Sequence, residues 1–268
     1  MMPHDEHRVV FFVHIMKTGG STALNTLMKF YSKPSRYPRP GMFGAIEEKG
    51  LTASLLAVEP ERARALRWIA PHVPLSLAID RRASSERPVA ITLVLRDGLS
   101  RALSHLRQVS RRFDHRYSYR ELLDLPLIGE FFLANHQTRV LGMGREGWPL
   151  WDNCVRGLAE LPRAFEDPGS VPAIPPVDEA LFAAALARLD EVDVLGLQDD
   201  FSGWWRACQA QFGWPDEPTE RVNVGDSQEK EAPPPIPGDI MDELRRRNLL
   251  DQRLYEAARD KLAGMADS

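Results

Sequence analysis

The chain has 268 residues, of which 43% are apolar, and it carries a formal net charge of −4. This length and apolar content suffice for one large α/β domain, so we predict that residues 1–268 form a single domain. The slightly acidic charge argues against partners such as nucleic acid or an anionic membrane surface. The two cysteines, Cys154 and Cys208, belong to no C-x-x-C pair, so the sequence indicates neither a zinc site nor a disulfide framework.

The N-terminal stretch MMPHDEHRVV is polar and mixed in charge. It lacks the basic region and following apolar region of a secretory signal. The longest apolar run, residues 9–15, is far too short to span a bilayer. We therefore predict a cytoplasmic protein without a transmembrane segment; the sequence carries no signal of its oligomeric state.

Apolar runs and amphipathic stripes alternate along the chain. The predicted buried strands are residues 9–15, 89–95 and 192–197. The predicted helices are residues 24–31, 51–68, 99–106, 118–143, 182–189, 201–212 and 239–262, and the predicted proline-rich loops are residues 166–177 and 213–238. This alternation predicts an α/β fold with a mostly parallel sheet flanked by helices on both faces.

The turn after the first predicted strand carries the groups of an anion site. Its residues are Lys17, Thr18, Gly19, Gly20, Ser21 and Thr22. Ligands of open α/β sheets bind beyond the carboxyl ends of strands, and the two glycines allow the backbone to approach a ligand closely. The first N–H groups of the following helix are predicted to lack internal partners, and Lys17 adds a full positive charge. The segment therefore predicts a phosphate or sulfate site.

The lysine of this segment is placed differently from that of the usual P-loop. The Walker motif, G-x-x-x-x-G-K-[ST], puts its lysine directly after the last glycine. Here Lys17 precedes Gly19 and Gly20, and no Walker string occurs in the chain. A glycine pair after a strand could also be an ordinary turn. The combination of strand, lysine, glycines and amphipathic helix favours the anion site.

Two motifs resemble those of sulfotransferases. Residues 14–22, HIMKTGGST, resemble the 5′-phosphosulfate-binding loop of that family, H-I-P-K-T-G-G-T, with Met16 in place of proline. Residues 96–104, RDGLSRALS, resemble its 3′-phosphate site, R-D-P-x-x-R-x-x-S, with Gly98 in place of proline. A guanidinium at a strand tip can hold a phosphate by two hydrogen bonds. The alternative for the second motif is a solvated Arg-Asp pair and a surface serine.

The resemblance implies a P-loop-NTPase-like fold and a sulfuryl transfer from 3′-phosphoadenosine-5′-phosphosulfate (PAPS). The group would pass to a hydroxyl of a carbohydrate or other small acceptor, leaving 3′-phosphoadenosine-5′-phosphate (PAP). It implies no metal. The donor-binding residues that it implies are Lys17, Thr18, Gly19, Gly20, Ser21, Thr22, Arg96 and Ser104, with Lys17 also catalytic.

His72 is the predicted catalytic base, because histidine titrates near neutrality. Its segment WIAPHVPL resembles the G-H segment that carries the catalytic histidine in carbohydrate 2-O-sulfotransferases and their bacterial relatives, with Pro71 in place of glycine. A lone histidine is more often structural. The competing candidates are His14, His105 and His136.

Weaker resemblances cover most of the chain. Residues 135–139, NHQTR, resemble an N-x-Q-T-R segment that helps to line the active site in bacterial members. Residues 221–225 resemble a loop that closes over the nucleotide, and residues 250–255 resemble the last helix. The basic stretch from Arg107 to Arg120 is either a solvated face or a contact for an acidic or already sulfated acceptor.

Two rival functions stay open. A P-loop-like nucleotide kinase would depend on magnesium and prefer ATP. A non-catalytic nucleotide-binding module of the same fold would bind the nucleotide without any dependence on His72.

Overall fold

A computed structural model gives the structure of the chain. It describes residues 8–27, 29–37, 50–58, 60–214 and 234–266. Within these residues a five-stranded parallel sheet has the strand order β2-β3-β1-β4-β5. The strands are β1 (Val9–Val13), β2 (Arg36–Tyr37), β3 (Trp68–Ile69), β4 (Val89–Leu95) and β5 (Val194–Leu197). The predicted α/β class and parallel sheet are therefore confirmed.

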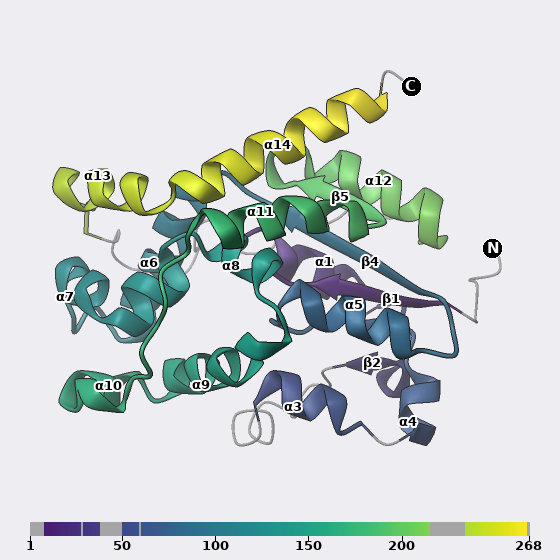
Figure 1. Ribbon diagram of the computed structural model, residues 1–268, viewed down its shortest axis with the longest axis horizontal. Helices are drawn as coiled ribbons and strands as arrows, with labels where there is room; N and C mark the ends of the chain where they lie inside the picture. Colours follow the sequence, from purple (N-terminus) through teal and green to yellow (C-terminus); the bar gives the residue numbers. More distant parts are fainter. Residues whose placement is uncertain (1–7, 28, 38–49, 59, 215–233, 267–268) are drawn as a thin grey trace.

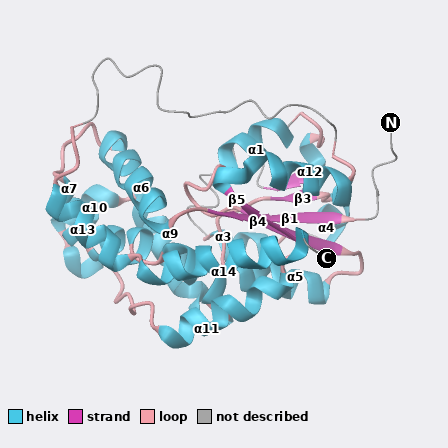
Figure 2. Cartoon of the chain, turned by 90° about the horizontal axis from the view of Figure 1, so that it is seen from above, coloured by secondary structure: helices cyan, strands magenta, loops and turns pink. Residues whose placement is uncertain are grey.

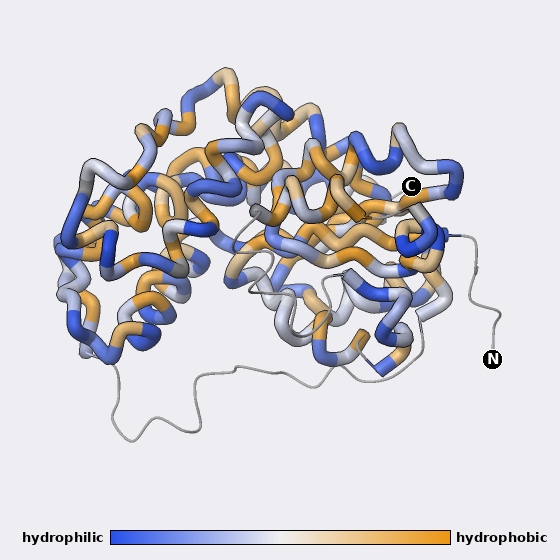
Figure 3. Tube along the Cα trace, turned by 90° about the horizontal axis from the view of Figure 1, so that it is seen from below, coloured by the Kyte–Doolittle hydropathy of each residue, from blue (hydrophilic) through white to orange (hydrophobic). Residues whose placement is uncertain are grey.

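The two central strands are buried on both faces. Every residue of β1 and β4 is buried, and the pairing runs from Val9 opposite Val89 to Val13 opposite Leu93. Because successive side chains of a strand point to opposite faces, Val9 and Val13 join one core while Phe12 joins another. Figure 3 shows the apolar strands inside the molecule and polar turns around them.

Helices cover both faces of the sheet, so the fold has three layers (Figure 2). On one face lie α1 (Gly20–Leu27) and α12 (Phe201–Phe212). On the other lie α5 (Leu75–Ser84), α11 (Glu179–Arg188) and α14 (Leu249–Ala266), with α8 (His136–Gly142) packed against all three. Trp204 and Trp205 of α12 fill the core between the sheet and the layer formed by α1 and α12.

A further group of helices lies beyond the carboxyl ends of the strands (Figures 1 and 2). It contains α6 (Gly98–Arg112), α7 (Tyr119–Asp124), α9 (Trp148–Ala159), α10 (Leu161–Glu166) and α13 (Gly238–Arg247). A π-helical segment, Leu127–Leu133, leads from α7 toward α8. Two short helices, α3 (Leu51–Leu56) and α4 (Pro60–Ala65), precede β3. Of the helices that the structure describes, none is both long and apolar enough to span a bilayer.

Several predicted boundaries are wrong. Residues 51–68 form α3, α4 and the first residue of β3 instead of one helix. β3 has two residues, too few to show the alternation of apolar and polar side chains that marks a strand. The predicted helix 118–143 is divided at Pro126 and Asn135, and the helix predicted for residues 239–262 is divided at Asn248. The other corrections are that β2, β3, α5, α9 and α10 were not predicted, and that Tyr31 lies beyond α1. Residues 215–233, which include the predicted loop 221–225, lie outside the described residues.

Candidate anion-binding site

Three neighbouring strands bring the predicted residues to one edge of the sheet. The segment 17–22 follows β1, Arg96 follows β4, and His72 lies three residues after the end of β3. Since β3, β1 and β4 are adjacent and parallel, their carboxyl ends meet at the same edge. The chain proceeds from β1 toward β2 on one side and later to β4 on the other. Such a switch point is where open α/β sheets bind ligands.

The loop after β1 has a strained and internally bonded backbone. Lys17 has a φ of 70°, a conformation that costs a non-glycine residue about 1 kcal/mol or more, and Gly19 has a φ of 96°. The buried Thr18 hydroxyl donates to the Ile15 carbonyl at 3.0 Å, so it holds the loop instead of facing a ligand. The Thr22 N–H donates to the Gly19 carbonyl at 3.0 Å.

The Thr18 hydroxyl and the Thr22 N–H therefore already have internal acceptors. The N–H groups of Gly20 and Ser21 open α1, and within the described chain neither has a main-chain acceptor. The Ser21 side chain is exposed. These two N–H groups are therefore donors that the loop offers to an anion, and Lys17 adds a positive charge beside them.

His14 supports this loop from beneath. A Cβ on Gly20 would stand 2.0 Å from atoms of the His14 ring, so only glycine fits above the imidazole. The ring also stacks on Phe12, with centroids 5.5 Å apart. Burial, and then the nearby His72, lower the pKa of His14 well below 6.5. His14 is therefore a neutral packing residue under the loop.

His72 has the tautomer that a general base needs. Its Nδ1 lies 2.6 Å from the His14 carbonyl oxygen, and its ring centroid lies 4.1 Å from that of His14. Because a carbonyl only accepts, Nδ1 carries the proton and Nε2 keeps its lone pair. Burial lowers the pKa of His72 below 6.5, against the hydrogen bond to His14, so the ring is neutral at pH 7. The Trp151 indole donates to the His72 carbonyl at 2.9 Å and fixes this segment.

Arg96 is held at its main chain and reaches the loop with its side chain. The Gln137 amide bonds both main-chain groups, accepting from Arg96 N at 2.8 Å and donating to Arg96 O at 2.7 Å. Arg96 Nη1 donates to the Lys17 carbonyl at 3.1 Å. Burial lowers the pKa of Arg96, and its Nε is a buried donor with no hydrogen-bond partner in the described chain. An unpartnered cationic donor at a strand tip fits a phosphate oxygen.

A buried carboxylate behind Arg96 was missed by sequence reasoning. Asp251 of α14 is fully buried and accepts from the N–H groups of Gln137 and Thr138 at 3.0 and 2.7 Å. Arg101, also fully buried, has its Nε 3.8 Å from Asp251. Gln137 therefore belongs to a network under the site and does not line it. The NHQTR motif was the only available signal, because nothing local to Asp251 indicates its partners.

The structure supports a role in the site less directly for Ser104, His105 and His136. Ser104 lies on α6, partly exposed, and no side-chain hydrogen bond joins it to Arg96 in the described chain. His105 and His136 are almost fully buried, and burial lowers both pKa values well below 6.5. A base must reach the substrate. Partly exposed His72 fits that requirement better than either of them.

The basic stretch divides into two parts. Arg120 forms ion pairs with Asp124, Asp239 and Glu243, the two shortest at 2.7 Å. It therefore ties α7 to α13 on the surface. Arg107 is exposed on α6 and stays a candidate for contact with an acidic acceptor.

Two comparisons with known sequences add no relative. Neither a scan against models of protein families nor a search of curated protein sequences gives a match.

Proposed function

We propose that the protein is a sulfotransferase that moves a sulfuryl group from PAPS to a hydroxyl of an acceptor such as a carbohydrate. One observation carries the proposal. The loop of Lys17, the guanidinium of Arg96 and the imidazole of His72 converge at one sheet edge. Arg96 Nη1 lies 3.1 Å from the Lys17 carbonyl oxygen, and His72 Nδ1 lies 2.6 Å from the carbonyl oxygen of His14, directly after β1. An anion loop, a second phosphate-binding cation and a neutral base are the three parts that this transfer needs.

We expect a P-loop-NTPase-like site at this edge, and the residues present there fit PAPS as the donor. Lys17 and the N–H groups of Gly20 and Ser21 would bind the 5′-phosphosulfate. Arg96, with its unpartnered Nε, and Ser104 would bind the 3′-phosphate, the group that distinguishes this donor from ATP. When bound, PAPS supplies an activated sulfuryl group.

His72 has the chemistry for the proton transfer. Its Nε2 accepts the proton of the acceptor hydroxyl while the hydroxyl oxygen forms a bond to sulfur. The bond between sulfur and the bridging oxygen of the 5′-phosphate breaks, and the electron pair stays on that oxygen. Lys17 and the N–H groups at the start of α1 stabilise this charge. The products are a sulfate ester and PAP, and His72 returns its proton to water.

Binding calorimetry tests the donor class. PAP, ADP and AMP are titrated without magnesium into the wild-type protein, Arg96→Ala and Arg64→Ala, in which an exposed arginine of α4 is removed. We expect tight binding of PAP alone, lost in Arg96→Ala and kept in Arg64→Ala. Equal binding of the three nucleotides would refute the proposal, and a magnesium-dependent preference for ATP would favour the kinase.

A turnover assay then separates an enzyme from a binding module. PAP release from PAPS is measured during a screen of hydroxyl-bearing acceptors, with wild type and with Lys17→Ala. We expect acceptor-dependent release that falls strongly in the variant. Turnover within a few-fold of wild type would show that Lys17 does not have its assigned role.

A further inference from the structure

The opposite edge of the sheet carries a row of arginines. Arg36 is the first residue of β2, Arg67 directly precedes β3, Arg8 directly precedes β1, and Arg87 lies two residues before β4. These strands are neighbours in the order β2-β3-β1-β4. The amino ends of four adjacent strands therefore place four arginines side by side, far from the candidate site at the carboxyl ends.

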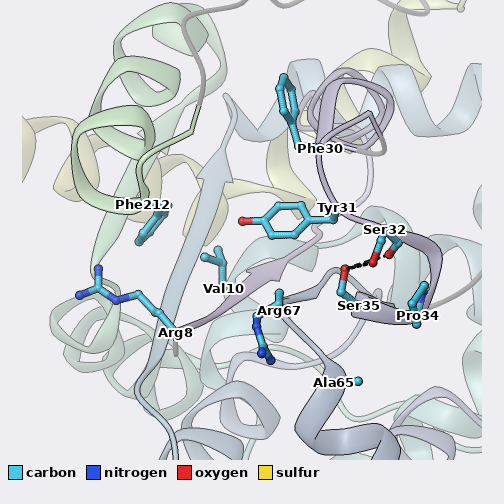
Figure 4. A pocket seen from close by; sticks show the side chains of 10 residues that line it. All are labelled: Arg8, Val10, Phe30, Tyr31, Ser32, Pro34, Ser35, Ala65, Arg67 and Phe212. Atoms are coloured by element: carbon cyan, nitrogen blue, oxygen red, sulfur yellow. Dashed lines mark hydrogen bonds between the residues drawn. The ribbon is translucent and has the colours of Figure 1, made fainter. Parts of the chain in front are cut away.

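A cavity of 480 Å³ opens at this amino edge, within the usual size of small-molecule sites. Arg8 and Arg67 line it together with the rings of Phe30, Tyr31 and Phe212 (Figure 4). No carboxylate is among the described residues that line it. The lining thus combines aromatic walls with two cations.

Tyr31 supplies an oriented donor. Figure 4 shows its ring lying across the middle of the lining side chains. The ring stacks on Trp68 at 5.9 Å, and its oxygen accepts from the Trp214 indole at 2.9 Å. Its own proton therefore stays available to a ligand acceptor. Burial raises the pKa of Tyr31 to about 12, so the hydroxyl keeps that proton at neutral pH.

Arg67 and Arg87 at this edge are bonded to main-chain carbonyls. Arg67 Nη1 donates to the carbonyls of Leu66 at 3.1 Å and Arg64 at 2.8 Å, and Arg87 Nη2 donates to the same Leu66 oxygen. Within the described chain neither Arg67 nor Arg87 forms an ion pair, and Arg87 Nη1 is buried without a hydrogen-bond partner. Two guanidinium groups that share one neutral acceptor are stabilised by a bound anion.

We propose that this cavity is a second ligand site and that it binds a small aromatic anion. The ring of the ligand packs against Phe30 and Phe212, and its anionic group binds Arg67 and the Tyr31 hydroxyl. The charged side chains that line the cavity are arginines, and no described lining residue is a carboxylate, which selects an anion over a cation. The proposal does not depend on the sulfotransferase function.

Calorimetric titration with 4-nitrophenyl phosphate tests the proposal. We expect saturable binding that Arg67→Gln weakens about tenfold or more, as expected when a charge-assisted hydrogen bond is lost. Arg64→Gln, the same charge change on an exposed residue that does not line the cavity, should leave the affinity unchanged. The neutral analogue 4-nitrobenzyl alcohol should bind at least tenfold more weakly.

Three outcomes would overturn it: no binding at millimolar probe, an equal loss in Arg67→Gln and Arg64→Gln, or loss of binding in Lys17→Ala. The last would place the probe at the carboxyl edge. Because Arg67 also bonds the end of α4, its variant could fail to fold. Tyr31→Phe then serves as the second variant. It removes the donor but keeps the ring, and it should weaken the probe several-fold.

Discussion

The two edges of the sheet both present arginines, but they hold them differently. At the carboxyl edge, Arg96 is bonded to Gln137, 41 residues away, and to Lys17, 79 residues away. At the amino edge, Arg67 bonds carbonyls one and three residues away. Arg96 is thus positioned by remote segments of the fold, whereas the Arg67 side chain is held by its own neighbours in the chain. Loss of the remote partner Gln137 should therefore displace Arg96 and leave Arg67 in place.

The largest expected effect is that of His72→Asn on turnover. The asparagine amide can still donate to the His14 carbonyl, but it cannot accept a proton as Nε2 does. We expect kcat with a responsive acceptor to fall by about 10²- to 10⁴-fold, the range for a lost general base. PAP affinity should stay within about twofold of the wild-type value by calorimetry, if the base alone accounts for the loss.

Arg67→Gln is the matched change at the other edge, and it should leave kcat unaltered. If His72→Asn abolished PAP binding as well, His72 would be a support of the loop and the base would have to be sought elsewhere. If Arg67→Gln lowered kcat, the two edges would be coupled and the comparison would fail.

Gly20→Ala should give the next largest effect, on stability and PAP binding together. The new Cβ would meet the His14 ring at 2.0 Å, and the ring is confined by Phe12 and His72. Overpacking of this kind costs about 1–3 kcal/mol of unfolding free energy, measurable by denaturant titration. Gly238→Ala, where a Cβ meets nothing within 4 Å, is the control. Equal stability of both variants would show that the His14 ring yields.

The sequence predicted what long patterns and local motifs encode. The runs that became β1, β4 and β5 are continuous and apolar, and segment 17–22 lies at the turn where its motif placed it. The two-residue strands β2 and β3 were missed, because two residues show no periodicity. Asp251 was missed for a different reason. Its partners lie more than 110 residues away, so only the folded chain brings them together.

Gln137→Leu tests the long-range support of Arg96. Leucine of similar size removes both hydrogen bonds to the Arg96 main chain and leaves its N–H and carbonyl without their partner. Such a loss costs about 1–3 kcal/mol, so we expect PAP affinity to fall about tenfold in calorimetry. Binding of 4-nitrophenyl phosphate at the amino edge should not change. Gln108→Leu, on an exposed position of α6, is the control, and an unchanged PAP affinity in Gln137→Leu would contradict the positioning role.

The smallest expected effect per residue is a loss of stability in mild acid, and it should come from the carboxyl-edge half of the molecule. His14, His105 and His136 are buried there with pKa values well below 6.5, chiefly because burial disfavours the charged ring. The unfolded chain therefore binds more protons once the pH falls below 6.5. Stability is full above that pH and is lost as the pH falls toward the folded-state pKa values.

Each of these histidines should cost about 1 kcal/mol of unfolding free energy at pH 6, measured by denaturant titration at pH 7.5 and pH 6. His136→Gln isolates one of them: its stability at pH 7.5 can differ from wild type, but its acid-induced loss should be smaller by that amount. His115→Gln, at an exposed histidine, should show the wild-type loss. If both variants lose as much stability as wild type, protonation of His136 is not part of the acid response.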